Sequence, residues 1–146
     1  MSKNLWINSA LFVSPISMCL CLDEKAFEDR LDELSIKKNR PEFDDMKSSD
    51  AVVHFFDNDD GNVCAVVALP NSDQIDDDII VSLLIHEGVH IWQEVRKYVG
   101  EEAPSAEFEA YSIQSICTDL IASYREQVNQ KQEAEAAQET KEKVSE

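Results

Sequence analysis

The sequence is poor in basic residues. Only 13 Lys and Arg stand against 30 Asp and Glu, which gives a formal net charge of -17. A chain this acidic repels the phosphates of DNA and RNA, so we expect no nucleic acid among its partners. The same charge is compatible with a basic protein partner. The composition therefore argues against nucleic-acid binding and leaves protein partners open.

Cysteine is also scarce. The 146 residues include four cysteines, each in or beside an apolar run: Cys19, Cys21, Cys64 and Cys117. This density is too low for a disulfide scaffold, and we expect reduced, buried thiols in a cytoplasmic protein. Because Cys19 and Cys21 are two residues apart, they would point to one face of a strand, which is also the spacing of a metal or redox pair.

Long apolar runs are missing as well. No segment reaches the roughly 20 apolar residues that a membrane-spanning helix needs. Lys3 precedes an apolar stretch that ends at Leu22, but polar residues interrupt this stretch and no small-x-small cleavage site follows. We therefore expect neither secretion nor membrane association.

The first half of the chain has the pattern of short strands and one helix. Residues 4–13 suit a strand or a short helix, and residues 16–22 suit a buried strand. Asp23 is a candidate N-cap for a helix that ends near Ser35. Residues 51–56 and 62–69 are two further strands, and the Asp- and Asn-rich segment between them predicts a hairpin loop.

Two long helices are predicted in the second half. The first runs from about Ile75 to Val99, with Gly100 at its C-terminal cap. The second follows Pro104, with Ser105 as its N-cap, and its apolar stripe ends at Tyr124. We expect one α+β domain over residues 1–124, with a small antiparallel or mixed sheet packed on the two helices. Residues 125–146 form a polar tail that lacks an apolar face and should fray.

The strongest functional signal is the segment H-E-G-V-H at residues 86–90, inside the first long helix. Residues four apart share a helix face, so His86 and His90 can direct two imidazole nitrogens at one point. This is the H-E-x-x-H pattern in which two histidines bind zinc and the glutamate, here Glu87, is the general base. Shortly after the motif, Trp92 suits a core position and Gln93 suits the helix surface.

A catalytic zinc site needs a third protein ligand, and the second long helix offers two carboxylates. Glu107 would share a helix face with Tyr111, whereas Glu109 would share a more apolar face with Ile113 and Ile116. Periodicity leaves this choice open and slightly favours Glu109 as the buried one.

Together, the motif at residues 86–93 and the segment E-F-E-A-Y at residues 107–111 resemble the gluzincins, zinc metallopeptidases with a Glu ligand on the next helix. More narrowly, they are similar to short phage and prophage proteins. The resemblance covers about residues 79–121 and implies a zincin-like fold, with His86, His90 and Glu107 as the Zn²⁺ ligands. Tyr111 departs from the family pattern, because many gluzincins have Asp or Asn at this place.

The resemblance also implies a mechanism. Zinc supplies an activated water, and Glu87 takes its proton and passes it to the leaving amine. A further donor should stabilise the oxyanion. Tyr111 is the candidate of choice, with Tyr98 and His54 as the others. The peptide or protein substrate would lie extended along an edge strand, for which residues 62–69 are the expected candidate.

A second hypothesis comes from a different functional class. His86 and His90 could be ordinary helix histidines, and the acidic chain could be a catalytically inactive zincin-like or acidic interaction protein that binds a host protein. Glu107 has a structural interpretation too, because a glutamate in the first turn of a helix is favoured by the helix dipole.

Overall fold

The computed structural model describes residues 14–44, 50–57 and 61–144. Within these ranges the chain forms an α+β fold, with one three-stranded mixed sheet and three α-helices, as the sequence predicted. The elements are β1 (Ile16–Cys21), α1 (Glu24–Glu33), β2 (Val52–Asp57), β3 (Val63–Ala68), a 3-10 turn (Ser72–Gln74), α2 (Asp77–Tyr98) and α3 (Ala106–Val144). The strand or helix expected within residues 4–13 lies outside the described residues, as does the middle of the predicted hairpin loop.

The central strand of the sheet is β3. It pairs in parallel with β1, from Ile16 opposite Val63 to Cys21 opposite Ala68. It also pairs antiparallel with β2, which confirms the predicted hairpin. The expectation that residues 62–69 present an edge to a substrate is therefore wrong, because the hydrogen-bonding groups of β3 are used on both sides. Among the described strands, β1 and β2 both lie at an edge of the sheet, and β2 is the edge strand that contacts α2.

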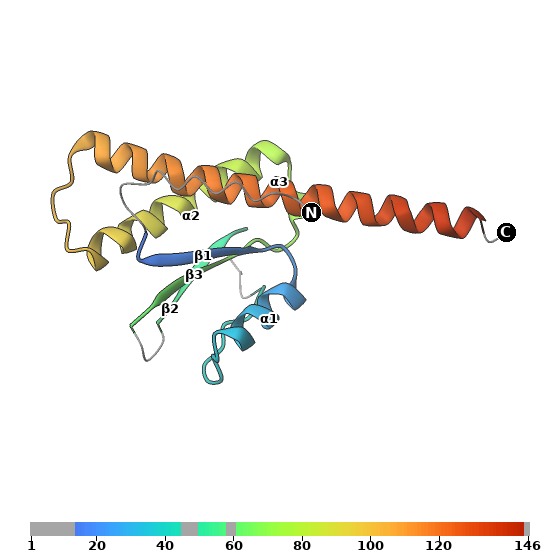
Figure 1. The fold of residues 1–146 in the computed structure, drawn as a ribbon, viewed down its shortest axis with the longest axis horizontal. Helices are drawn as coiled ribbons and strands as arrows, with labels where there is room; N and C mark the ends of the chain where they lie inside the picture. The colour runs from blue at the N-terminus through green and yellow to red at the C-terminus, as the bar shows by residue number, and fades with distance from the viewer. Residues whose placement is uncertain (1–13, 45–49, 58–60, 145–146) are drawn as a thin grey trace, which may run out of the picture.

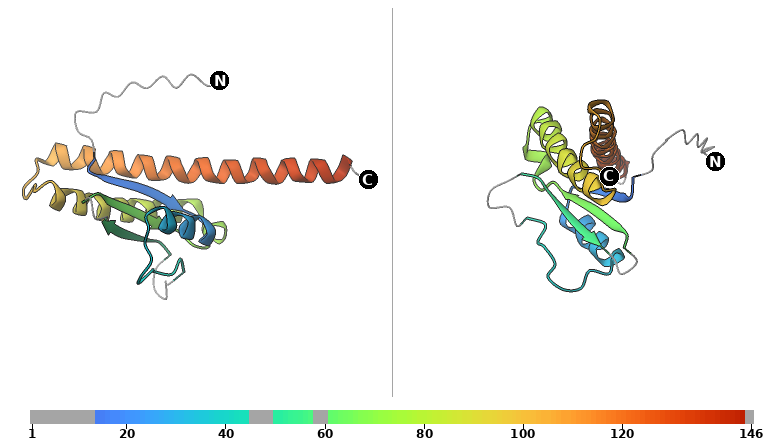
Figure 2. Two further views of the ribbon diagram at one scale, coloured as in Figure 1. Left: turned by 60° about the horizontal axis from the view of Figure 1, so that its bottom comes forward. Right: turned by 90° about the vertical axis from the view of Figure 1, so that its left-hand side faces the viewer.

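The two faces of the sheet are covered by different helices (Figures 1 and 2). Alternate strand residues point to opposite faces, so each strand contributes to two apolar clusters. On one side, Val66 and Ala68 pack with Phe27 and Leu31 of α1. On the other side, the sheet packs against α2 and α3, and the buried members of this cluster include Leu20, Val67, Leu69, Ile80, Leu84, Ile91 and Leu120. The fold has three layers, with the sheet in the middle.

Local capping agrees with the predicted helix ends. Asp23 is the N-cap of α1, and its Oδ1 accepts a hydrogen bond from the Ala26 N–H at 2.8 Å. Ser105 Oγ accepts one from the Phe108 N–H at 3.3 Å, where α3 begins. Gly100 has φ of +70°, a left-handed conformation that glycine adopts at little cost just after a helix.

Helices α2 and α3 run antiparallel and approach closely at Gly88. A Cβ atom on residue 88 would lie 2.7 Å from the Sγ atom of Cys117. One end of this interface is held by the Cys117 Sγ–H, which faces the Ile85 carbonyl at 3.9 Å, and the other by Trp92 Nε1–H, which donates to Glu109 Oε2 at 2.9 Å. The face of α2 that carries Gly88 and Trp92 is therefore the face that α3 covers.

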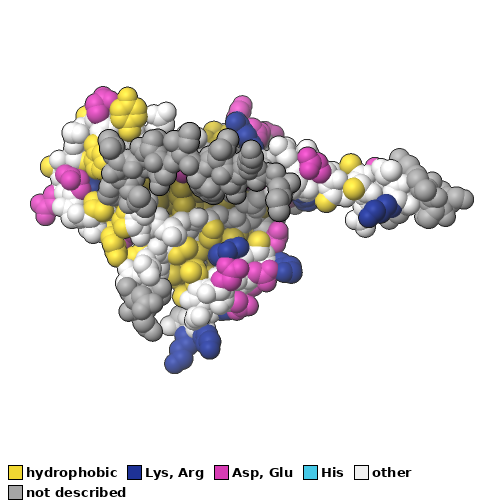
Figure 3. Space-filling model, in the orientation of Figure 1, with side chains coloured by type: hydrophobic (Ala, Val, Ile, Leu, Met, Phe, Trp, Pro, Cys, Tyr) yellow, Lys and Arg dark blue, Asp and Glu magenta, His cyan; other side chains and the backbone are white. Residues whose placement is uncertain are grey.

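Beyond Tyr124, α3 continues as one helix past the rest of the fold (Figures 1 and 2). Gln127 Nε2–H donates to the Leu20 carbonyl at 3.0 Å, and Val128 packs on the core. All side chains from 129 to 141 are exposed. Figure 3 shows charged groups of both signs along this projecting part. No described helix is both long enough and apolar enough to span a membrane.

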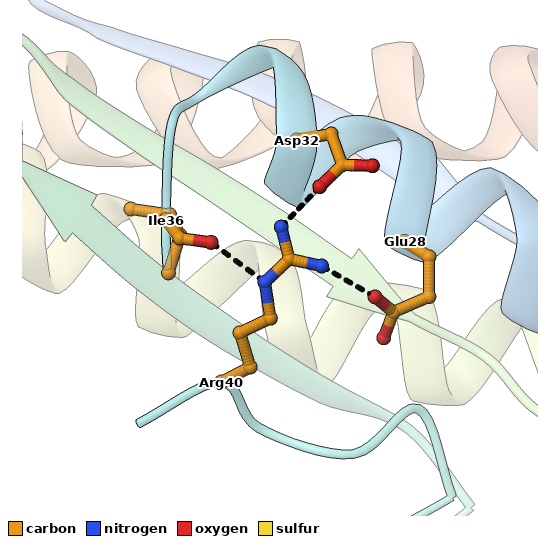
Figure 4. Close-up of polar contacts among 4 residues, drawn as sticks. All are labelled: Glu28, Asp32, Ile36 and Arg40. Atoms are coloured by element: carbon orange, nitrogen blue, oxygen red, sulfur yellow. Dashed lines mark hydrogen bonds and ion pairs between the residues drawn. The ribbon is translucent and has the colours of Figure 1, made fainter. Parts of the chain in front are cut away.

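The segment after α1 is held by one guanidinium (Figure 4). Arg40 Nε–H donates to the Ile36 carbonyl and Nη1–H to Glu28 Oε2, both at 2.6 Å. The other terminal nitrogen bonds to Asp32. Three bonds from one planar fork fix the turn against α1, which a lysine could not reproduce.

Gly88→Val should test the close approach of α2 and α3. The new side chain would meet Cys117 and Ile116, so we expect a loss of about 1–3 kcal/mol in the free energy of unfolding, measured by urea denaturation. Adding Cys117→Ala should recover part of this loss. If the double variant loses as much free energy of unfolding as the two single variants lose together, the contact between residues 88 and 117 does not limit the packing.

Candidate metal centre

Helix α2 places His86 and His90 one turn apart, and their ring nitrogens converge. The two Nε2 atoms are 3.1 Å apart, and the rings meet edge to face with centroids 4.7 Å apart. Both side chains are exposed to solvent, on the side of α2 that α3 does not cover. The i, i+4 spacing therefore produces the predicted geometry.

Gln93 orients the second histidine. Its Oε1 atom lies 3.0 Å from His90 Nδ1. An amide oxygen can only accept, so this contact puts the proton on Nδ1 and leaves the Nε2 lone pair directed at His86. Metal-binding histidines are commonly held in this way by a partner on the other ring nitrogen. Sequence reasoning assigned Gln93 to the helix surface, although its position three residues after His90 was a usable signal.

The spacing of the two nitrogens suits a shared ion. With bonds of about 2.0–2.1 Å and tetrahedral angles, two ligand nitrogens on zinc lie roughly 3.3 Å apart, close to the 3.1 Å found here. A hydrogen bond between two neutral rings has a similar length and requires one ring to donate. Both arrangements use the same side-chain positions, so the spacing of the pair is compatible with two of the three protein ligands that a catalytic zinc needs.

Glu87 lies beneath the histidine pair and differs from it in environment. It is 5% exposed, and it is the only buried charged or polar residue in the part of the chain that the structure describes. Its carboxylate accepts a hydrogen bond from the backbone N–H of Val53 in β2. Burial raises the pKa of the Glu87 carboxyl, although the neighbouring His86 and His90 rings and this N–H oppose the shift.

These three residues line a cleft between α2 and the edge strand β2, with a volume of about 780 Å³. The strand wall consists of residues 50–53 and the half-exposed Phe55. The helix wall is formed by Ser82, Leu83, His86, Glu87, His90, Gln93, Glu94 and Lys97. The cleft is large enough for a short peptide segment. One wall is a strand and the other a helix, and the histidines lie on the helix wall.

The two carboxylates considered as third ligand lie elsewhere. Glu107 is exposed in the first turn of α3 and does not line the cleft. Glu109 accepts the Trp92 hydrogen bond and lies 3.7 Å from Arg96. The periodicity argument for Glu109 as the more buried carboxylate thus agrees with the structure, but its partners are structural.

Helix geometry explains why neither carboxylate reaches the pair. Gly88 faces α3. His86 and His90 each lie two residues from it, and at about 100° per residue this places them on nearly the opposite face of α2. The histidines therefore point away from α3. Within the described ranges, no group of three or more His, Cys, Asp or Glu side chains is placed to hold a metal ion. The structure does not bring Glu107 to the histidine pair.

The expected oxyanion donors are also placed outside the cleft. Tyr111 is 66% exposed on α3. Tyr98 donates its hydroxyl to the Gly61 carbonyl at 2.5 Å. The ring of His54 packs against Phe27 at a centroid distance of 5.7 Å, on the face of the sheet that α1 covers. The polar donors that line the cleft are Ser82, Gln93 and Lys97.

Comparisons with protein families, with curated proteins and with solved structures found no match.

The different surroundings of Glu107 and Glu109 lead to a stability prediction. Glu109→Ala would leave the buried Trp92 N–H without its acceptor, and we expect a loss of about 1–3 kcal/mol in the free energy of unfolding. Glu109→Gln keeps an acceptor and should lose less. Glu107→Ala is the matched control from the same helix turn and should change stability by no more than about 0.5 kcal/mol. Equal losses in both alanine variants would contradict this assignment.

Proposed function

We propose that this protein is a zinc-dependent metallopeptidase of zincin type, in which His86 and His90 bind the metal and Glu87 is the general base. The observation that carries this proposal is the convergence of the two Nε2 atoms at 3.1 Å, with His90 oriented by Gln93. The second support is the position of Glu87, which is buried directly beside the pair and lines the same cleft.

The chemistry follows from these positions. When bound, zinc would supply an activated water and polarise the scissile carbonyl. Glu87 would accept the proton of the attacking water and return it to the leaving amine, the two transfers that peptide hydrolysis requires. Gln93 would keep the Nε2 lone pair of His90 directed at the ion throughout.

The edge strand suggests how a substrate would bind. The cleft lies between the histidines and β2, and β2 has only one strand partner among the described strands. An extended peptide could pair with the backbone of β2 and cross the metal position, with Phe55 available to an apolar side chain. We therefore transfer the substrate-binding role from residues 62–69 to β2.

The third protein ligand of the zinc has two candidates. The family resemblance implies Glu107, whereas the carboxylates that line the cleft beside Glu87 are Asp50 and Glu94. Glu94 is ion-paired with Lys97, 3.1 Å away, which leaves Asp50, two residues before β2, as the alternative. The zinc content of Asp50→Asn and of Glu107→Gln distinguishes the two hypotheses, because only the variant that lacks the true ligand should lose the metal.

Zinc content per chain is the first test, measured by plasma mass spectrometry on zinc-supplemented protein. We expect about one zinc in the native protein and none in His90→Ala. With the fold described above, Glu107→Gln should retain zinc. If Glu107→Gln loses zinc as His90→Ala does, α3 must be rearranged in the metal-bound protein and the ligand implied by the resemblance is the right one. Native protein without zinc would refute the proposal.

Hydrolysis is the second test, measured with an unfolded, fluorescently labelled protein and with a mixed peptide library as substrates. Glu87→Gln should keep zinc but lower the rate by at least about 100-fold, because the proton acceptor is lost. Glu94→Gln is a matched control on the same cleft wall and should remain active. Undiminished hydrolysis by Glu87→Gln would remove Glu87 from the mechanism.

One set of observations favours a second candidate, a zincin-like interaction protein without catalysis. The Glu87 carboxylate is already bonded to the Val53 N–H, and the described residues provide only two converging ligands. The net charge of -17 would suit a basic protein partner. Such a protein would keep its biological effect in Glu87→Gln at unchanged stability, whereas a peptidase would lose it.

A further inference from the structure

Three of the four cysteines lie together on the face of the sheet that α1 covers. Cys19 and Cys21 are on β1, and Cys64 is on the neighbouring strand β3. The parallel register pairs Ser17 with Cys64, which places Cys19 two residues further along the same face. Sequence spacing indicated only the Cys19–Cys21 pair, and the strand pairing adds Cys64.

The register makes Cys19 the middle member of the group. It lies diagonally across the β1–β3 pair from Cys64 and two residues before Cys21 on β1. Cys21 is buried, while Cys19 and Cys64 are half-buried. Cys64 also lines a small cavity of about 140 Å³ between the hairpin and the segment after α1, which gives the group a route to solvent. Arg30 of α1 is close enough to act electrostatically on all three thiols.

The strand register disfavours a disulfide between Cys19 and Cys64. Neighbouring strands lie about 4.8 Å apart and two residues span about 6.6 Å along a strand, so the Cα atoms of these diagonal neighbours are about 8 Å apart. Disulfides need Cα atoms within roughly 7 Å. An ion between the two sulfurs removes this difficulty, because two metal–sulfur bonds of about 2.3 Å on opposite sides of an ion span roughly 4.6 Å between the sulfurs.

We propose that Cys19 and Cys64 bind one soft monovalent metal ion of the copper(I) class through their two sulfurs. Soft thiolate ligands select such ions. Binding replaces two thiol protons, so that two neutral thiols and one M⁺ give a complex of charge -1 and two released protons. Arg30 of α1, which is also ion-paired with Glu33, acts electrostatically on both ligand residues and favours the remaining negative charge.

Zinc is a poorer match for the same thiols. A structural zinc site needs four ligands, and within the described ranges no three His, Cys, Asp or Glu side chains converge on one point. A two-sulfur site suits an ion that accepts linear coordination.

The test is a titration of the full-length reduced protein with Cu(I), in competition with the chromogenic chelator bathocuproine disulfonate. We expect one Cu(I) bound per chain and a fall of two in the number of thiols that react with a disulfide reagent, from the four in the sequence. Cys19→Ser and Cys64→Ser should each weaken Cu(I) binding by more than about tenfold. Native mass spectrometry should show the added mass of one copper ion.

The chain provides matched controls. Cys117→Ser alters a thiol at the α2–α3 interface, on the other side of the sheet, and should bind Cu(I) as the native protein does. His90→Ala should also be unaffected, which separates this site from the histidine cleft. If the native protein competes no better than Cys19→Ser, or if Cys117→Ser is the variant that loses binding, the proposal is wrong. Circular dichroism of each variant checks that the fold is retained.

Discussion

The close approach of α2 and α3 at Gly88 is the constraint on which the arrangement of the functional side chains depends. With no side chain at position 88, the backbone of α2 can lie against Cys117 of α3. This contact selects the face of α2 that is covered, and helix periodicity then directs His86 and His90 to the opposite side, toward the β2 edge of the sheet. The histidine cleft is thus a consequence of helix packing as much as of the motif.

Glu87 links the helix layer to the sheet at the same place. It is buried at 5% exposure, and its carboxylate meets the Val53 N–H of the edge strand. A buried carboxylate is costly unless it is hydrogen-bonded, and the Val53 N–H supplies such a bond. Its place beside two converging imidazoles is the arrangement on which the proposed role of general base depends. The same bond also stabilises the position of β2, so one residue contributes both to the shape of the cleft and to its proposed reaction.

The two proposed metal sites differ in ligand type and lie on opposite sides of the sheet. The imidazoles of α2 suit a borderline ion such as zinc, whereas the thiols on the α1 side suit a softer ion. The apolar sheet between them, with Val66 and Val67 fully buried, separates the two ligand sets.

Local patterns in the sequence determined the order of the elements, the Asp23 and Ser105 caps and the i, i+4 histidine pair, because each depends on residues within a few positions of one another. The sequence alone could not decide which strand lies at the edge, since that depends on the pairing of β1 with β3 across more than forty residues. Nor could it decide how α3 is rotated against α2. Tertiary packing placed Glu109 on Trp92, left Glu107 exposed, and brought Cys64 to Cys19. These outcomes depend on contacts between distant segments, which periodicity does not encode.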